Sequence, residues 1–441
     1  MRRLRCCLLL WTLGLGLSWC SSGPAAEPAR VLSRPKLPSD AELAPLGLMR
    51  HWYAYVGVAD RSDHLVSAQV FGNQVVTQSR GGTITCLDGE TGARLWSVRP
   101  SDRRSTFQIP LAANDHIVAY YGGGKLFGLD RVSGALDWTL EAPGVLSTFP
   151  ALDDAHLFVA TTDGKVHVYL LPTPRRVAAQ TAVAQATAMP ASARLPAAAS
   201  LKSPFFIWSI RLDSPALEPP ASFGLYITFA DGTGKLMSFE NERRALQDQV
   251  SMAAPIVAPL TAAGDQLFVA SRDHSVTSYQ MVAGNFSPRW RFLANSRIDQ
   301  QPAVIGSDVF AVAAIDGLYC LNRTTGGARW QQRRGAQFLA ASGRLAFARD
   351  PAKQLLAIDR QRGVVLQEWN ASEFAHFLTN TDTDRVVLAN DDGLVLCLRD
   401  RDPAAAKPAN YRSAPEAKPK PGSKPEKPAE KEEKTTNDTD G

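Results

Sequence analysis

Hydrophobic and polar positions alternate along most of the chain in short stretches that are separated by glycine-containing turns. In the clearest example, residues 74–78 alternate in this way, residues 80–82 contain Gly-Gly, and residues 83–87 alternate again. Such alternation predicts β-strands with one buried face, and Gly-Gly or Asp-Gly suits the positive φ angles of a tight hairpin turn. Further Asp-Gly turns begin at Asp163, Asp231, Asp316 and Asp392. The pattern therefore predicts an all-β protein built from hairpins.

A longer phrase follows the hairpins and indicates the architecture. A Leu-Asp corner, a Thr-Gly pair and a tryptophan recur at residues 87–96, 129–138 and 321–330, with Ser for Thr in the second copy and Asn for Asp in the third. A looser copy begins at Ile358, where Trp369 comes two places late. Strand-rich units that repeat with a period of about 40 residues are typical of a β-propeller, whose blades stack in a ring because none can bury its faces alone.

Counting the units predicts an eight-bladed ring. The expected blades lie near residues 65–99, 107–142, 148–211, 221–250, 254–293, 301–332, 337–370 and 375–399. The last unit has inner strands but no tryptophan, whereas the strand-like segment 51–56 precedes the first hairpin. We expect residues 51–56 to supply the outer strand of the eighth blade, because this pairing closes the ring and removes exposed strand edges.

Tryptophans and cysteines recur at fixed places in the repeat. Seven tryptophans are expected at one equivalent position, with none in blade four: Trp52, Trp96, Trp138, Trp208, Trp290, Trp330 and Trp369. Recurrence in so many blades favours a structural wedge between blades over an aromatic ligand surface. Three cysteines outside the leader share another position, which Ala357 occupies in blade seven: Cys86, Cys320 and Cys397. We expect them to be buried, reduced thiols, the alternative being an interchain disulfide.

The N-terminal residues predict export. Arg2, Arg3 and Arg5 precede an apolar run, residues 6–17, that is short for a membrane span, so residues 1–20 are expected to be a signal peptide. The alternative is an uncleaved anchor helix. Cys20 stands where a lipoprotein signal presents its acylated cysteine, although Trp19 departs from the small residue that usually precedes it. Lipidation of Cys20 and ordinary cleavage nearby both remain open. Either outcome places the protein in the periplasm or on the outer membrane.

Outside the ring, the expected segments are a linker at 21–48, an insertion at 172–202 within the propeller of 49–401, and a Pro/Lys/Glu-rich tail at 402–441. The tail has too few apolar residues to offset ordering entropy and is expected to be disordered. The insertion is interpreted as a surface loop, with partner binding as the alternative.

Charge and residue spacing exclude several kinds of site. The net charge is +5, of which the three leader arginines contribute three, so the exported chain carries +2 and shows no nucleic-acid footprint. Its seven histidines show no metal-ligand spacing, and there is no Cys-x-x-Cys. No residue is assigned a catalytic, cofactor-binding or metal-binding role.

The repeated phrase resembles the repeat of the pyrroloquinoline-quinone (PQQ)-type propellers, over about residues 65–400 and the closing strand. In that family a tryptophan and a glycine hold neighbouring blades together. The resemblance implies this role for three pairs: Trp96 with Gly92, Trp138 with Gly134, and Trp330 with Gly326.

Two branches of that family lead to different functions. Quinoprotein dehydrogenases bind PQQ and Ca²⁺ and carry long insertions, and many have adjacent cysteines; this chain has such a pair only at Cys6-Cys7. The other branch, the BamB-type outer-membrane assembly lipoproteins, consists of non-enzymatic eight-bladed scaffolds. The resemblance to this branch implies a non-catalytic scaffold that binds protein partners in the cell envelope, without PQQ and with a possible lipid anchor. The alternatives are a degenerate PQQ-dependent oxidoreductase and an envelope sensor or glycan-binding module.

Overall fold

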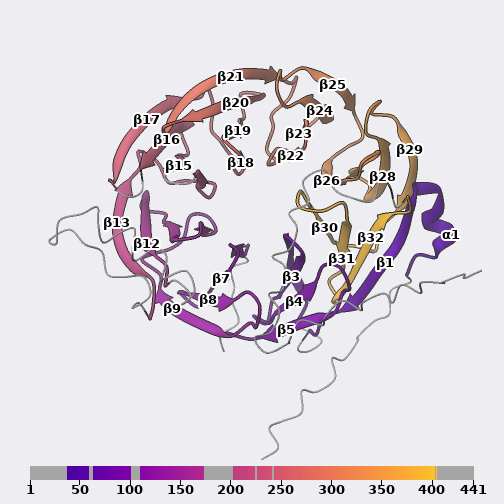
Figure 1. Ribbon diagram of the computed structural model, residues 1–441, viewed down its shortest axis with the longest axis horizontal. Helices are drawn as coiled ribbons and strands as arrows, with labels where there is room; N and C mark the ends of the chain where they lie inside the picture. The colour runs from indigo at the N-terminus through magenta and orange to yellow at the C-terminus, as the bar shows by residue number, and fades with distance from the viewer. Residues whose placement is uncertain are drawn as a thin grey trace, which may run out of the picture.

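Eight antiparallel sheets of four strands each stand around a central axis in the computed structural model of the protein (Figure 1). The structure describes residues 37–58, 63–100, 110–172, 202–223, 226–240, 243–402 and 404. The predicted all-β, eight-bladed propeller is confirmed. The signal peptide, Cys20, most of the expected insertion and nearly all of the expected tail lie outside the described residues.

Blades one to four follow the expected units. Their strands, from the axis outward, are β2 (Leu65–Phe71), β3 (Gln74–Ser79), β4 (Ile84–Asp88) and β5 (Arg94–Val98); β6 (Ala112–Ala113), β7 (Ile117–Gly122), β8 (Lys125–Asp130) and β9 (Leu136–Glu141); β10 (Ala151–Leu152), β11 (His156–Ala160), β12 (Lys165–Leu170) and β13 (Phe205–Arg211); and β14 (Ala221–Phe223), β15 (Tyr226–Ala230), β16 (Lys235–Glu240) and β17 (Ala245–Ser251).

Blades five to seven repeat this order, and blade eight combines strands from both ends of the chain. Their strands are β18 (Thr261–Ala263), β19 (Gln266–Ala270), β20 (Ser275–Val282) and β21 (Asn285–Leu293); β22 (Ala303–Ile305), β23 (Asp308–Ala313), β24 (Gly317–Asn322) and β25 (Ala328–Gln332); β26 (Gln337–Ala341), β27 (Leu345–Arg349), β28 (Gln354–Asp359) and β29 (Val365–Asn370); and β30 (His376–Leu378), β31 (Val386–Ala389), β32 (Leu394–Asp400) and β1 (Leu48–Tyr55).

The ring closes through the pairing of β1 with β32. The register runs antiparallel from Leu48 opposite Asp400 to Tyr55 opposite Leu394. The N-terminal strand therefore forms the outer edge of the last blade, as its position before the first hairpin predicts. Because this pairing is the only strand contact that joins the two chain ends among the described residues, it converts an open row of blades into a ring.

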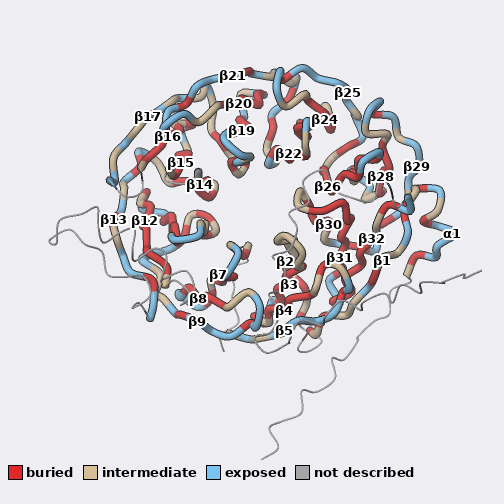
Figure 2. Tube along the Cα trace, in the orientation of Figure 1, coloured by how far each residue is buried: buried red, intermediate tan, exposed pale blue. Residues whose placement is uncertain are grey.

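The core lies on the faces where neighbouring blades meet, and the perimeter is exposed (Figure 2). Every residue of β23 is buried, whereas in β25 only Trp330 is buried. Between blades six and seven, for example, the rings of Phe310 and Phe338 stack with their centroids 4.4 Å apart. The second and third strands of blade six are therefore buried on both faces, as expected for strands with a blade on either side.

The end of the expected linker is folded, which corrects the predicted domain boundary at residue 49. Helix α1 (Asp40–Leu43) and a 3-10 turn, η1 (Ala44–Leu46), precede β1. Ser39 caps α1 in a capping box with Glu42. Leu43 and Leu46 are 0% and 2% exposed and belong to the apolar core of blades seven and eight. One helical turn is too short to show a 3.6-residue period, so the hydrophobic pattern does not reveal it.

Candidate functional site at the blade junctions and the ring closure

Six of the seven tryptophans occupy one equivalent position. Each lies opposite the equivalent residue of the third strand of its blade, and the residue just before each tryptophan forms a β-bulge in the outer strand. The pairs are Trp52 with Cys397, Trp96 with Cys86, Trp138 with Gly128, Trp208 with Val168, Trp290 with Ser278, and Trp330 with Cys320. Their side chains are between 3% and 9% exposed. The bulge bends and twists the outer strand, so the indole on each strand is turned toward a neighbouring blade.

Trp369 does not occupy this position, which corrects the prediction for blade seven. Trp369 lies opposite Leu355, and Gln367 stands opposite Ala357 at the equivalent place. The spacing from the corner glycine explains why Gln367 and not Trp369 occupies the position. Gly92 precedes Trp96 by four residues, and Gly363 precedes Gln367 by the same interval. Trp369 instead packs on Phe374 and on the core that contains Leu43. The folded N-terminal segment therefore contacts blade seven, one of the two blades that lack an equivalent tryptophan.

Four of the wedge tryptophans pack on the corner glycine of the next blade, not on the glycine of their own repeat. A Cβ atom built on Gly92 would lie 2.6 Å from Trp52, and one on Gly134 would lie 2.6 Å from Trp96. Gly326 and Gly363 have the same relation to Trp290 and Trp330, at distances of 2.5 and 2.6 Å. The pairs implied by the family resemblance, such as Trp96 with Gly92, are therefore wrong by one blade.

A hydrogen bond accompanies four of these contacts. The indole Nε1 donates to a corner carbonyl of the next blade: Trp52 to Gly89 at 2.9 Å, Trp96 to Arg131 at 3.0 Å, Trp290 to Arg323 at 2.8 Å, and Trp330 to Arg360 at 2.8 Å. Trp138 and Trp208 have no such bond within the described part of the chain. The corner that follows Trp138 runs into residues outside that part.

An arginine at the corner forms a second link between blades that the sequence analysis did not predict. Arg131, Arg323 and Arg360 each follow the Asp or Asn of a corner. The guanidinium of Arg360 donates to Ser342 O of its own blade at 2.7 Å and to Ile305 O of blade six at 3.0 Å. It also donates to the buried carboxylate of Asp308 at 2.8 Å. This link between blades through a corner arginine is called the arginine clamp below. An arginine occurs at this place in three copies of the repeated phrase, so an alignment of the copies carries a signal for the clamp.

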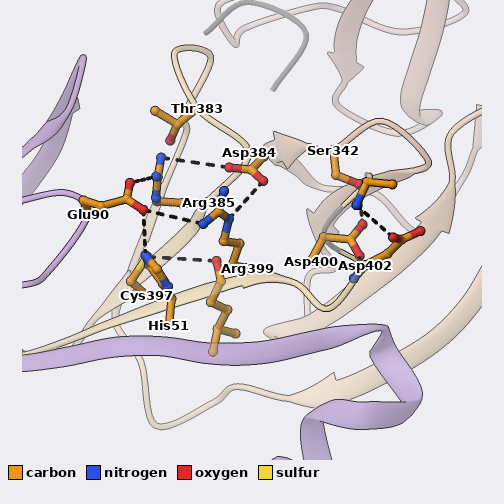
Figure 3. A network of polar contacts seen from close by, with 12 residues as sticks. His51, Glu90, Ser342, Thr383, Asp384, Arg385, Cys397, Arg399, Asp400 and Asp402 are labelled. Atoms are coloured by element: carbon orange, nitrogen blue, oxygen red, sulfur yellow. Dashed lines mark hydrogen bonds and ion pairs between the residues drawn. The ribbon is translucent and has the colours of Figure 1, made fainter. Parts of the chain in front are cut away.

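The closing junction between blades eight and one has no corner arginine. Gly89 stands there, and a Cβ atom on it would lie 2.9 Å from the backbone of Asn73. An ionic network takes the place of the clamp (Figure 3). Blade eight contributes Arg385, Arg399, Asp384 and His51, and blade one contributes Glu90.

Glu90 is the centre of this network. Its carboxylate forms ion pairs with Arg385 and with Arg399 at 3.5 Å, and His51 Nε2 lies 3.4 Å from it. Behind it, Asp384 lies 3.5 Å from Arg399 Nε and 3.9 Å from Arg385 Nη1, and its side chain is 0% exposed. A second contact crosses the junction where Gly72 N donates to Asp382 Oδ2 at 2.8 Å. Charged groups from both chain ends thus hold the closing blade against the first.

Burial controls protonation in the network. Desolvation, more than the two neighbouring guanidiniums, lowers the pKa of His51, so the imidazole is neutral at pH 7. Desolvation also raises the pKa of Asp384 to about 6, against the opposing effect of Arg399. The network therefore sets two carboxyl groups, those of Glu90 and Asp384, against the guanidiniums of Arg385 and Arg399. This balance is the condition under which a buried ionic cluster is tolerated.

The geometry of the network favours a structural role. The space beside it has a volume of about 10 Å³ and is lined by Asn73, Asn380, Thr383 and Arg385, among others. That is room for about one water molecule. A substrate does not fit beside Arg385, so the network serves to hold the two blades together.

Among the described residues, few other side chains are suited to catalysis or to metal binding. No group of three or more His, Cys, Asp or Glu side chains there is arranged to hold a metal ion. Cys86, Cys320 and Cys397 are free, buried thiols. Desolvation raises the pKa of Cys86 and of Cys320 to about 12. No helix within the described ranges is long and apolar enough to cross a membrane.

The ring of eight four-stranded blades, with tryptophan wedges and glycine corners, defines a PQQ-like propeller. The family model of the outer membrane protein assembly factor BamB matches residues 41–201 and 287–402, and the chain belongs to this family. The crystal structure of BamB from Moraxella catarrhalis is similar, with a TM-score of 0.58 and 14% identity over 80% of this chain and 97% of that chain. The computationally designed Ika8 protein gives a TM-score of 0.55 and 13% identity over 77% and 97% of the two chains. No curated protein sequence matches the chain significantly.

Proposed function

We propose that the protein is a non-catalytic interaction scaffold of the bacterial cell envelope that takes part in the assembly of outer-membrane proteins. Membership of the BamB family, over most of the ring, is the observation that carries this proposal. A propeller of this kind offers its partners the perimeter and the two faces of the ring. The perimeter has features of a binding surface.

Large apolar side chains are exposed on the outer strands. Seven of the eight outer strands carry at least one such residue: Met49 and Tyr53, Leu95, Leu136, Phe205 and Phe206, Leu246, Leu293, and Leu366. Outer strands also have one unpaired backbone edge, which can pair with an added strand. Exposed apolar groups beside an open edge are typical of strands that bind other chains.

The aromatic group on blade three is the strongest candidate contact. Phe205 and Phe206 are 42% and 47% exposed. The ring of Phe206 lies 5.7 Å from that of Tyr169 and 6.2 Å from that of His167. Aromatic side chains are enriched at protein interfaces because they bury a large area at a low entropic cost. The expected insertion joins the two strands that carry this group.

Photo-cross-linking in cells tests the scaffold role. A benzophenone amino acid at Phe206 is expected to capture outer-membrane assembly proteins, whereas the same group at exposed Gln331 of β25, the outer strand without an exposed large apolar residue, serves as the control. Capture of no partner at Phe206 or at other perimeter positions would contradict the proposal. Reduction of a dye by the purified protein with PQQ, Ca²⁺ and an alcohol or sugar would show that the protein is an oxidoreductase and would contradict the non-catalytic role.

We propose that export is followed by attachment to the outer membrane through acylated Cys20. The position of Cys20, three residues after the end of the apolar run, supports this. The intact mass of the exported protein distinguishes the outcomes, because a diacylated and N-acylated Cys20 adds three fatty chains, more than stable anchoring requires. An N-terminus beyond Cys20, with no added lipid mass, would refute the anchor.

A further inference from the structure

A hollow of about 430 Å³ lies at the perimeter between blades four and five. Its walls come from the end of β17 and from β20 and β21, which are neighbours on the ring (Figure 1). This junction is one that lacks a wedge tryptophan, because Asp248 of β17 stands opposite Ser238 at that position. Asp248 instead accepts a hydrogen bond from Phe286 N at 2.9 Å. The hollow is large enough for one or two amino-acid side chains.

The floor of the hollow combines apolar contacts with an unused hydroxyl. Met252 and Tyr279 line it, and Tyr279 OH lies 3.5 Å from Met252 Sδ. Thr277 also lines it, is 5% exposed, and its Oγ1 has no hydrogen-bond partner among the described residues. A buried hydroxyl without a partner costs free energy in the folded protein. A bound group that pairs with Thr277 Oγ1 would remove this cost.

The rim of the hollow carries an excess of positive charge. Arg291 forms an ion pair with Asp273 at 2.7 Å. Arg289 is exposed and has no ion pair in the part of the chain that the structure describes. It occupies the bulge of β21, between Pro288 opposite Tyr279 and Trp290 opposite Ser278, and a bulge of this kind redirects a side chain. One guanidinium is therefore available to a carboxylate at the mouth of the hollow.

We propose that this hollow binds a partner peptide in which an apolar side chain is followed by a carboxylate. The inference rests on the scaffold role proposed above and names the chemistry of one partner segment. The apolar side chain lies on Met252 and Tyr279, the peptide backbone pairs with Thr277 Oγ1, and the carboxylate pairs with Arg289. The open edge of β21 lies alongside and accommodates an extended chain.

A peptide array tests the proposal directly, because its spots represent the chemistry of the partner segment. The spots are acetyl-Gly-Xaa-Glu-Gly peptides, with Xaa as Leu, Met, Phe, Tyr or Trp, each beside a matched peptide with Gln in place of Glu. The exported full-length protein is expected to bind at least one Glu peptide about tenfold more tightly than its Gln partner, the factor typical of one charge-assisted hydrogen bond. Equal binding to every pair of peptides would overturn the proposal.

Four variants assign the binding to the hollow. Arg289→Gln is expected to remove the preference for Glu, whereas Arg362→Gln, a change at an exposed arginine of blade seven, leaves it intact. Ala253→Trp fills the hollow from an exposed rim position and abolishes binding. Thr277→Val is expected to weaken binding severalfold while leaving the melting temperature unchanged or higher, since the hydroxyl has no partner among the described residues. Full binding by Ala253→Trp would refute this location.

The array and the cross-linking experiment fail independently. Partners captured at Phe206, together with an array that shows no Glu preference, would leave the scaffold role standing and remove the hollow as its site. A Glu preference that depends on Arg289, without any partner captured in cells, would retain the binding site and contradict the scaffold role.

Discussion

The contact of Trp330 with the next blade can be removed from either side. Trp330 is 8% exposed, its indole packs on Gly363, and its Nε1 donates to Arg360 O at 2.8 Å. Trp330→Ala removes a buried aromatic side chain and leaves that carbonyl without its donor, so it is expected to cost about 3 to 5 kcal/mol. Trp369→Ala is expected to cost only about 1 to 2 kcal/mol, because Trp369 is half-buried and lies off the wedge position.

Gly363→Ala tests the same contact from the other blade. Gly363 has φ +74°, and a Cβ atom there would lie 2.6 Å from Trp330 Cδ2. The left-handed backbone costs an alanine roughly 1 to 2 kcal/mol, and displacement of the rigid indole adds about 1 to 3 kcal/mol. In the Trp330→Ala background the clash is absent and only the backbone cost remains. The two substitutions should therefore couple by about 1 to 3 kcal/mol.

Urea denaturation, monitored by far-ultraviolet circular dichroism, measures these free energies of unfolding. The slope of the free energy against urea concentration should be the same for each variant, which checks that all of them unfold in the same way. Circular dichroism does not depend on tryptophan fluorescence, which matters because three of the variants lack a tryptophan. Equal costs for Trp330→Ala and Trp369→Ala would refute the assignment of the wedge position in blade seven. An unchanged cost of Gly363→Ala in the two backgrounds would refute the contact between blades.

Three further predictions address closure, thiols and pH. Deletion of residues 21–58 removes β1 and should cause aggregation through the exposed edge of β32, whereas deletion of 405–441, of similar length, should change solubility and melting temperature little; equal behaviour would contradict closure by β1. Cys86 and Cys320 should label slowly at pH 8 in the native protein, because a pKa of about 12 leaves almost no thiolate; rapid labelling or a non-reducing dimer would contradict this. Burial raises the pKa of Glu218 to about 7, so the folded protein favours the protonated acid and loses stability as pH rises from about 4.5 to about 7. Glu218→Gln should therefore gain about 1 kcal/mol relative to wild type between pH 5 and pH 8, after allowance for partial exposure, and a pH-independent difference in urea midpoints would refute the shift.

Much of the fold could be predicted because a repeated sequence reports the same local structure many times. The alternation of residues 74–87 and the recurring turns predict the strands of one blade, and the period predicts their number. The unpaired segment 51–56 predicts the closing strand. The common position of Cys86, Cys320 and Cys397 is also confirmed, since each lies opposite a wedge tryptophan. These features depend on pairing within one sheet, where register follows from neighbouring segments of the chain.

The candidate sites were much harder to predict from the sequence. The displaced Trp369 and the arginine clamp at Arg360 were visible in the aligned repeats, but their meaning depends on which blade each side chain faces. The folded segment around Leu43 is a single turn without a period. The network around Glu90 joins residues that are 295 positions apart in the pair Arg385 and Glu90. No local pattern carries information about such a pair.

The sequence by itself determined the all-β class, the eight blades and the pairing of the two chain ends, because strand alternation, turn chemistry and repeat length are local properties. Only the tertiary structure decided how the blades meet. It placed four wedge tryptophans on the glycine of the following blade, assembled the ionic network where the ring closes, and left the hollow between blades four and five beside Asp248. These features arise from the twist and stacking of whole sheets, which bring together side chains that are distant along the chain.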